Sequence, residues 1–452
     1  MQNVLKYLKW KITERGARII WCDEKFEGAM EIPSHLDGAA VVEIGKEAFS
    51  KRHSLTSVAI PDSVEVVGEG AFAECDGLNE LRLGRGIKKI EKDAFLLCSS
   101  LKSVAIPDSV EVVGERAFER CRGLKELRLG RGIKKIEDCA FRWCDSLQSV
   151  VIPDSVEVVG KAAFLGCERL EELRLGRGIK KIEKYAFFRC RSLKSVVIPG
   201  SVEVVGKAAF AECDGLNELL LERGIKKIEH GAFATCISLQ SVDIPGSVEV
   251  VGYDAFADCD GLKELRLGRG IKKIEKEAFY SCSSLQSVAI PDSVEVVGED
   301  AFAWCKRLNE LRLGRGIKKI EDQAFNSCSS LKSVAIPDSV EVVGRWAFRK
   351  CSGLEELRLG KGIKTIEKEA FYSCSSLQSV AIPDSVEVVG ESAFARCSGL
   401  NELRLGRGIK KIEKDAFRDC SSLRRVVLPS TLEALARDAF GFGVDLVFDD
   451  ER

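Results

Sequence analysis

Residues 101–146 read LKSVAIPDSVEVVGERAFERCRG followed by LKELRLGRGIKKIEDCAFRWCDS, two related halves of 23 residues each. The leucine that opens each half recurs every 23 residues from Leu55 to Leu423, without insertion or deletion. A strict period of this length is typical of a solenoid, in which one coil cannot bury its apolar face alone and must stack on its neighbours. The sequence therefore predicts an α/β repeat solenoid, a right-handed superhelix of 23-residue coils.

The spacing of apolar residues within one coil predicts its cross-section. Alternating apolar residues over 101–106 predict a short parallel strand, and Pro107-Asp108-Ser109 predicts a corner, because proline cannot continue a ladder of hydrogen bonds. Residues 110–113 predict a second extended segment that ends at Gly114, where we expect a positive φ. The last apolar residues of the coil share one face of a predicted short helical turn: Ala117, Phe118 and Cys121.

The chain divides into three predicted regions. Residues 1–54 form an N-terminal cap, with short strands at 9–13 and 18–22 and an irregular first repeat. Residues 55–445 form the solenoid of 17 coils, which alternate between a proline type and a glycine type. Residues 446–452 form a C-terminal capping strand and an acidic tail. Such departures are expected at the ends, because a terminal coil must cover the core and discourage edge-to-edge pairing.

The charge balance limits the classes of partner. The chain has 69 Lys and Arg residues against 70 Asp and Glu residues, a formal net charge of -1. A nucleic-acid-binding domain would instead carry a basic face. No stretch approaches the roughly 20 apolar residues that span a bilayer, and residues 1–10 lack the apolar core of a secretory signal. We therefore expect no nucleic-acid partner and no membrane insertion, and the oligomeric state stays open.

Sixteen of the 18 cysteines fall on one position of the repeat, from Cys75 to Cys420. One identical cysteine per coil predicts a buried column of reduced thiols that all point the same way, and free cysteine packs as a small hydrophobe. Cys139 and Cys144 are the only close pair and have no histidine nearby, so we expect no metal site and no cofactor. Abundant free thiols favour a cytoplasmic or other reducing compartment.

Residues suited to catalysis are few. The three histidines, His35, His53 and His230, are far apart in the sequence and form no serine–histidine–acid set. The repeated Pro-Asp-Ser motif is interpreted as a structural corner, because its aspartates recur once in two coils, about 10 Å apart, too far to share one calcium ion. We therefore expect a protein that is not an enzyme.

The outward positions of the two strands alternate in charge from coil to coil. Glu111 is expected beside Lys134, and Val112 beside Lys135. One interpretation is that this alternation avoids stacking like charges at the strand spacing. The other is that it forms a shallow periodic surface for an extended partner.

The coils differ mainly at positions 15, 16, 19, 20 and 22. Large aromatic residues at these outward positions are typical of protein recognition, although drift at tolerant positions also produces them. The candidate partner-binding residues are Trp143, Tyr185, Phe188, Tyr253, Tyr280, Trp304, Trp346 and Tyr372.

The motif L-x-x-V-x-I-P-x-S-V-x-x-[VI]-G-x-x-A-F-x-x-C strongly resembles the BspA-like class of leucine-rich repeats, over roughly residues 18–448. Residues 32–49 resemble the usual opening of the array in that family. The resemblance implies a leucine-rich-repeat solenoid with a parallel sheet along one side, no enzymatic activity, and adhesion at a cell surface through a protein partner such as a component of the extracellular matrix. The alternative is a structural scaffold or an engineered repeat rod without a dedicated ligand.

Overall fold

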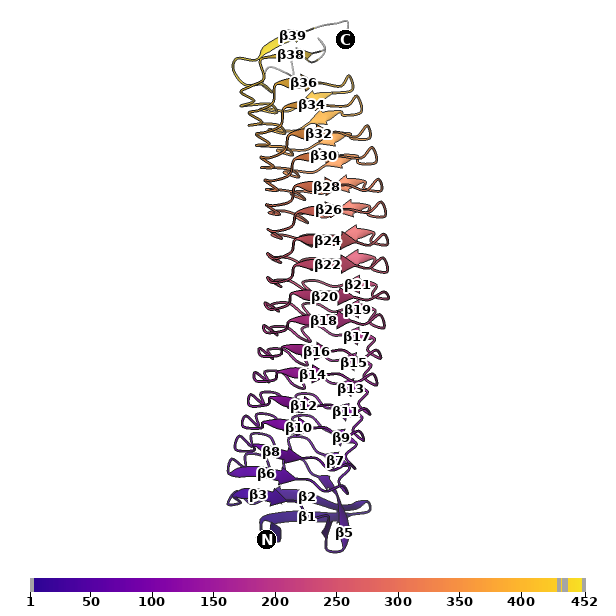
Figure 1. The fold of residues 1–452 in the computed structure, drawn as a ribbon, viewed down its shortest axis with the longest axis vertical. Helices are drawn as coiled ribbons and strands as arrows, with labels where there is room; N and C mark the ends of the chain where they lie inside the picture. Colours follow the sequence, from indigo (N-terminus) through magenta and orange to yellow (C-terminus); the bar gives the residue numbers. More distant parts are fainter. Residues whose placement is uncertain (1–3, 429–431, 433–437, 449–452) are drawn as a thin grey trace. The chain divides into compact units, whose positions relative to one another are not determined.

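In the computed structural model, residues 4–428, 432 and 438–448 are described, and the chain divides into two compact units, Met1–Ile225 and Lys226–Arg452. Within each unit the chain winds into stacked coils, and each strand lies beside the equivalent strand of the next coil (Figure 1). The predicted solenoid of 23-residue coils is therefore confirmed in each unit.

The first unit opens with a 3-10 helix and a short antiparallel hairpin: η1 (Val4–Tyr7), β1 (Leu8–Thr13) and β2 (Gly16–Cys22). Both strands of this hairpin were expected from the sequence. The strands β3 (Gly28–Glu31), β4 (His35–Leu36) and β5 (Ala39–Ile44) follow. β3 pairs in parallel with the first strand of the first regular coil, and β2 pairs in parallel with β5. The hairpin and the irregular coil thus supply pairing partners for both kinds of strand.

Each coil contributes one strand of three to five residues and a second strand of two residues. In the first unit the longer strands are β6 (Leu55–Ala59), β8 (Glu80–Arg82), β10 (Ser103–Ala105), β12 (Glu126–Arg128), β14 (Ser149–Val151), β16 (Glu172–Arg174), β18 (Ser195–Ile198) and β20 (Glu218–Leu221). The shorter ones are β7 (Val66–Val67), β9 (Lys89–Ile90), β11 (Val112–Val113), β13 (Lys135–Ile136), β15 (Val158–Val159), β17 (Lys181–Ile182) and β19 (Val204–Val205).

The second unit repeats this arrangement. Its longer strands are β22 (Ser241–Ile244), β24 (Glu264–Leu267), β26 (Ser287–Ala289), β28 (Glu310–Arg312), β30 (Ser333–Ala335), β32 (Glu356–Arg358), β34 (Ser379–Ala381), β36 (Glu402–Arg404) and β38 (Arg425–Leu428). Its shorter strands are β21 (Lys227–Ile228), β23 (Val250–Val251), β25 (Lys273–Ile274), β27 (Val296–Val297), β29 (Lys319–Ile320), β31 (Val342–Val343), β33 (Thr365–Ile366), β35 (Val388–Val389) and β37 (Lys411–Ile412).

Neighbouring coils pair in parallel and without a shift of register. Val104 lies opposite Leu127, and Val112 lies opposite Lys135, as the sequence predicted. The eight apolar residues of the coil 101–123 are each at most 3 % exposed: Leu101, Val104, Ile106, Val110, Val113, Ala117, Phe118 and Cys121. The inward positions predicted from the apolar spacing are therefore confirmed.

Phenylalanine rings stack face to face inside each unit. Ring centroids are 4.8–5.4 Å apart from Phe49 to Phe210 in the first unit. They are 5.0–5.5 Å apart from Phe233 to Phe440 in the second. Burying one such side chain contributes about 1.5–3 kcal/mol. Because each ring is covered by rings of adjacent coils, this stabilisation depends on stacking.

The predicted short helical turn is wrong. The described coils contain strands and turns but no α-helix, so the predicted α/β class is corrected to a solenoid of strands and turns. Between Gly114 and Cys121, alternate N–H groups donate to the carbonyl three residues earlier in the same coil: those of Ala117, Glu119 and Cys121. The N–H groups between them donate to the next coil: those of Arg116, Phe118 and Arg120. A helix would direct every N–H group along its own axis, so bonding between coils prevents it.

The positive φ expected at Gly114 is also wrong. The residues with positive φ in this coil are Arg116, at 54°, and Arg120, at 60°. Gly114 is needed for a different reason, since a Cβ atom there would lie 2.7 Å from the carbonyl carbon of Glu91 and 2.8 Å from the oxygen of Ile90. Its N–H group donates to that same oxygen at 2.9 Å.

The glycine-type corner packs closely against the preceding proline-type corner. A Cβ atom on Gly130 would lie 2.2 Å from the carbonyl oxygen of Pro107, and one on Gly132 would lie 2.0 Å from that of Asp108. Real Cβ atoms do not approach a backbone oxygen so closely, so only glycine fits. The two types of coil are therefore complementary at this edge.

All 18 cysteines are free, and the column of sixteen is buried as predicted. Each thiol of the column that has a described bond donates to a phenylalanine carbonyl of the preceding coil, as Cys121 Sγ does to Phe95 O at 3.3 Å. Burial raises the pKa of Cys121 to about 12. These thiols consequently stay protonated and unreactive at neutral pH.

At the other end of the second unit, β38 pairs in parallel with β39 (Asp445–Phe448). A strand therefore lies where the capping strand was predicted. The acidic tail predicted at 449–452 lies outside the described residues, and the division into three regions stays a prediction. Among the residues that the structure describes, none belongs to a helix with the length and apolar character that crossing a membrane requires.

Candidate functional site

The Pro-Asp-Ser corners have structural contacts. Asp108 Oδ1 accepts the N–H group of Arg131 in the next coil at 2.8 Å, and Ser109 Oγ donates to Ile87 O of the previous coil at 2.7 Å. The aspartates of five further corners make the same bond to the following coil: Asp62, Asp154, Asp292, Asp338 and Asp384. The structural interpretation of this motif is thus supported by its hydrogen bonds.

The charged strand positions form exposed ion pairs, within a coil and between coils. Lys135 Nζ lies 3.1 Å from Glu137 Oε1, and Lys88 Nζ lies 3.0 Å from Glu65 Oε1. Exposed pairs of this kind contribute about 0–1 kcal/mol each. They account for the alternation of charge without a ligand.

The coils differ from one another on one side, which we call the variable face and define as positions 15, 16, 19, 20 and 22 of every coil. In the coils from Leu55 to Leu400, positions 16 and 20 both have positive φ, whatever residue they hold. Most of their N–H groups donate to the next coil, as Trp143 N does to Leu165 O and Trp304 N does to Asn326 O, both at 2.8 Å. Variable side chains therefore project from a backbone that is the same in each coil.

The eight aromatic residues predicted as partner-binding all lie on the variable face, but they do not form one cluster. Three are in the first unit and five in the second. Trp304 is the most accessible of the eight, with 39 % of its surface exposed, and the other seven are half-buried. Neighbouring coils at the strand spacing cover part of each ring, and the role of these residues in partner binding stays a prediction.

Cationic side chains lie over several of these rings. The Arg189 guanidinium is 5.3 Å from the ring centroid of Phe188, and Lys306 Nζ is 5.5 Å from that of Trp304. The Tyr372 ring has two such neighbours, Arg349 at 5.2 Å and Arg396 at 5.6 Å. Paired aromatic and basic side chains of this kind are common in protein interfaces, and the sequence pattern did not identify the cations.

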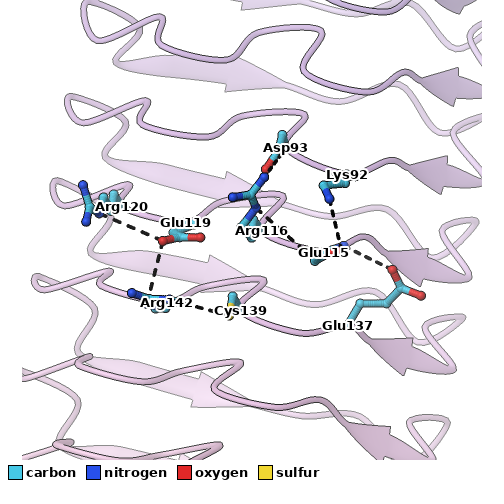
Figure 2. A network of polar contacts seen from close by, with 9 residues as sticks. All are labelled: Lys92, Asp93, Glu115, Arg116, Glu119, Arg120, Glu137, Cys139 and Arg142. Carbon is cyan, nitrogen blue, oxygen red and sulfur yellow. Dashed lines mark hydrogen bonds and ion pairs between the residues drawn. The ribbon is translucent and has the colours of Figure 1, made fainter.

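A polar network joins three successive coils of the first unit, with Arg116 near its centre (Figure 2). Arg116 Nη2 lies 2.7 Å from Asp93 Oδ2, and this hydrogen bond raises the pKa of Arg116. The nearby Glu119 carboxylate is only 6 % exposed. Its Oε1 lies 3.7 Å from Arg142 Nε and 4.0 Å from Arg120 Nε. The network holds this part of the variable face in one arrangement.

The same network contains the one cysteine that is not fully buried. Arg142 Nη1 approaches Cys139 Sγ at 4.0 Å (Figure 2). Burial nevertheless raises the pKa of Cys139. A nucleophilic cysteine needs a lowered pKa, so this arrangement does not activate the thiol.

Trp143 lies across the next coil, against Gly166. A Cβ atom on Gly166 would be 2.2 Å from Cε3 of the indole. Trp143 and Gly166 both occupy position 20, so the large residue of one coil is accommodated by the absence of a side chain in the next.

In the second unit, positions 20 and 22 of four successive coils line a groove of ≈ 420 Å³. We call it the serine groove, and its residues are Trp304, Lys306, Ser327, Ser329, Lys350, Ser352, Ser373 and Ser375. Of these, only Trp304 was predicted from the sequence. The signal that could have identified the others is the composition of positions 20 and 22. Between Asp260 and Asp419, these two positions hold mostly serine and no carboxylate.

Acidic side chains occur in the first coil of this groove and in the coils before it. Burial, followed by the negative charge of Glu277, raises the pKa of both Asp254 and Asp300 to about 6. In the described part of the chain, no three His, Cys, Asp or Glu side chains are grouped so that they could hold a metal ion. The histidines predicted to be apart from one another do not meet: His53 contacts Asp76, and His230 contacts Tyr253.

Known proteins with leucine-rich repeats resemble this chain in sequence and fold. The family model of the BspA type leucine rich repeat region matches residues 42–168, 134–263, 226–354 and 318–443. A leucine-rich repeat protein from Bacteroides ovatus is 26% identical with a TM-score of 0.52, over 99% of this chain and 100% of that chain.

Two other solved structures are less similar. A leucine rich cell surface protein from Faecalibacterium prausnitzii is 24% identical with a TM-score of 0.45, over 88% of this chain and 93% of that chain. The pneumococcal vaccine antigen PcpA is 16% identical with a TM-score of 0.43, over 99% of this chain and 98% of that chain. No curated protein matches the chain.

Proposed function

The chain belongs to the BspA-type leucine rich repeat family, and from this premise we propose that it is a non-enzymatic interaction protein of the adhesion type. It binds a protein partner through the variable face. The candidate contact residues are the eight aromatic side chains of that face, together with the cations beside them.

One observation carries this proposal: the side chains that differ between coils are all mounted on the same backbone. Position 20 holds Trp143, Gly166 and Trp304 in different coils, yet each has a positive φ and donates its N–H group to the next coil. A constant backbone with variable side chains is suited to recognition, because little ordering is required when a partner binds. The variation is not needed for the backbone conformation, which is the same whichever residue is present.

The contacts also support a role without catalysis. The one half-buried thiol, Cys139, has a raised pKa, and the corner aspartates and serines are bonded to neighbouring coils. Neither arrangement activates a nucleophile or poises a general base near neutral pH. A binding role needs none of these groups.

The location of the protein is a separate part of the proposal. The column of free thiols favours a reducing compartment, whereas the adhesion role implies a cell surface as the alternative. Surface biotinylation of intact producing cells distinguishes the two, because only a surface protein is labelled before lysis.

The binding proposal is tested with a variant in which three tryptophans are replaced, Trp143→Ala, Trp304→Ala and Trp346→Ala. Its matched control carries Val151→Ser, Val197→Ser and Leu220→Ser, which remove apolar side chains that are 59%, 46% and 54% exposed on the longer strands. Each protein is immobilised and exposed to purified extracellular-matrix proteins and to a cell extract, and circular dichroism establishes that each is folded.

We expect the unchanged protein and the strand control to capture the same partner, and the tryptophan variant to lose it. Loss in the strand control alone would place the binding surface on the strands. Equal capture by all three proteins would defeat the variable-face proposal, and no saturable capture by any of them would favour a scaffold without a dedicated ligand.

A further inference from the structure

The serine groove of the second unit has a composition unlike the rest of the variable face. Five of its eight lining residues are serines, two are lysines, and one is a tryptophan. The hydroxyls of Ser329 and Ser375 donate to carbonyl oxygens of the preceding coil, at 3.3 and 3.4 Å. Each hydroxyl oxygen then keeps lone pairs that can accept a hydrogen bond from a ligand. The groove wall is therefore a row of hydrogen-bonding groups.

The groove has positive charge that nearby carboxylates do not neutralise. Lys306 and Lys350 are exposed, and no ion pair joins either of them to a carboxylate of the described residues. They lie two coils apart, which corresponds to about 10 Å at the usual strand spacing. Most other lysines of this unit differ, as Lys332 does in pairing with Glu355 at 2.9 Å. Lys306 is at position 22 of its coil and Lys350 at position 20, and two ammonium groups without carboxylate partners along one groove favour an anionic ligand with spaced charges.

The backbone N–H groups at position 20 of the groove already have hydrogen-bond partners. The N–H groups of Trp304, Ser327, Lys350 and Ser373 donate to carbonyl oxygens of the next coil at 2.7–2.8 Å. A peptide therefore finds no free strand edge to extend, which is the usual way an extended peptide binds a β structure. Recognition in the groove must use the side chains.

The apolar part of the groove is a single indole. Trp304 is 39 % exposed, and Lys306 Nζ lies over its ring at 5.5 Å. The next residue on the row, Ser327, is only 7 % exposed. A protein partner needs apolar pockets for its anchoring side chains, and the groove offers none beyond this ring. A flat aromatic surface beside hydroxyls and ammonium groups suits a sugar ring, whose C–H face is apolar and whose edge is polar.

We propose that the serine groove binds a linear anionic oligosaccharide. One sugar ring packs against the indole of Trp304, and the exposed hydroxyls of Ser329, Ser352 and Ser375 bond to sugar hydroxyls. Lys306 and Lys350 bind carboxylate or sulfate groups carried by residues of the saccharide that are two coils apart. This ligand differs from the protein partner proposed above, and its site uses Trp304 but none of the aromatic residues of the first unit.

The test measures binding of the full chain to four probes by isothermal titration calorimetry. The probes are a heparin decasaccharide, which is sulfated, an oligogalacturonate of similar length, which is carboxylated, a neutral dextran oligomer, and poly-glutamate. Three variants are compared with the unchanged protein: Trp304→Ala, the pair Lys306→Gln and Lys350→Gln, and the control pair Lys318→Gln and Lys364→Gln. The control makes the same change of charge at exposed lysines outside the groove.

We expect saturable binding of the heparin or the galacturonate probe, none of dextran, and weaker binding as salt is raised. Each groove variant is expected to weaken that binding about tenfold, whereas the control changes it less than twofold. Preference for the sulfated or the carboxylated probe identifies the anionic group. Tighter binding of poly-glutamate, equal binding by the groove and control variants, or no saccharide binding at millimolar concentration would overturn the proposal. Failure of the protein-capture experiment does not change the expected saccharide binding, so each proposal can fail without the other.

Discussion

At the residue scale, two corner glycines differ in the space around them. Gly200 and Gly246 occupy the position where six other proline-type coils have aspartate. A Cβ atom on Gly246 would lie 3.7 Å from the nitrogen of Arg269, which is ordinary contact. A Cβ atom on Gly200 would lie 2.3 Å from the oxygen of Arg223. The same substitution therefore has opposite consequences at the two corners.

We expect Gly246→Asp to stabilise the second unit by about 1 kcal/mol, because the new carboxylate accepts the Arg269 N–H and the unfolded chain loses conformational freedom. Gly200→Asp is expected to destabilise the first unit by about 1–2 kcal/mol through overlap with Arg223. Urea denaturation measures both changes, and amide exchange at Arg269 reports the new bond. Equal effects at the two corners would contradict the interpretation of the corner geometry.

A second prediction concerns backbone conformation at position 20. Thr235 has a φ of 60°, a conformation that is costly for a β-branched residue. We expect Thr235→Gly to stabilise the second unit by about 1 kcal/mol. In the matched control, Thr365→Gly in β33, the same replacement in a strand should destabilise by about 1 kcal/mol. Denaturation midpoints that shift in the same direction for both variants would contradict this expectation.

The sequence could predict the corner but not the positive φ of positions 16 and 20. Proline, aspartate and serine have intrinsic turn preferences, so their role is visible locally. Position 20, in contrast, holds Trp143, Thr235 and Ser327, which share no preference for positive φ. Their conformation is imposed by backbone hydrogen bonds to the next coil, and such bonds do not require a particular residue type.

At the element scale, the turn of each coil depends on its neighbour. The expected helical turn was inferred from the spacing of Ala117, Phe118 and Cys121, and the same spacing is satisfied by successive turns that face inward. Periodicity alone therefore could not distinguish a helical turn from these successive turns. The burial of these residues was predictable, whereas the way their backbone is bonded was not.

Asp300, in the first coil of the serine groove, predicts a dependence of stability on pH. Burial, then Glu277, raises the pKa of Asp300 to about 6. The folded unit thus favours the protonated carboxyl, so its stabilisation is full below the pKa of the unfolded chain, about 4, and is lost as the pH rises through 6.

We expect Asp300→Asn to stabilise the second unit by about 1 kcal/mol at pH 7, after allowance for solvent screening, and to have little effect at pH 4. The amide can still accept the hydrogen bond that Gln323 donates at 3.1 Å. Urea midpoints between pH 4 and pH 7 measure the change, with Glu310→Gln on exposed β28 as the control for charge alone. A gain that is the same at both pH values would show that titration of Asp300 is not its cause.

At the scale of the whole molecule, the period, the inward residues and the thiol column were all predictable, because each is repeated at a fixed interval. The serine groove was not, since it depends on which residues lie side by side in the four coils 285–376. Lys306 and Lys350 are unremarkable in the sequence and become significant only once coils are stacked. Repetition therefore predicts the scaffold, and its exceptions carry the candidate sites.

The distribution of thiols predicts a simple chemical result. Cys139 is half-buried, whereas the other 17 cysteines are buried. We expect a thiol reagent at pH 8 to modify one cysteine of the folded protein rapidly, and all 18 after denaturation without reductant. Cys139→Ser should abolish the rapid reaction. Several rapidly reacting thiols, or fewer than 18 after denaturation, would contradict the buried, unbridged column.

The tight fit of Gly130 and Gly132 against the preceding proline corner has a consequence for how such a chain changes length. Coils of the two types alternate from Leu55 to Leu423, so genetic recombination preserves this alternation only when it adds or removes coils in pairs. Excising residues 285–330 would join Leu331 to a glycine-type predecessor and keep the alternation of corners, whereas removing one glycine-type coil would place two proline corners side by side. The absence of a Cβ atom at the corner glycines thus favours changes in length by two coils at a time.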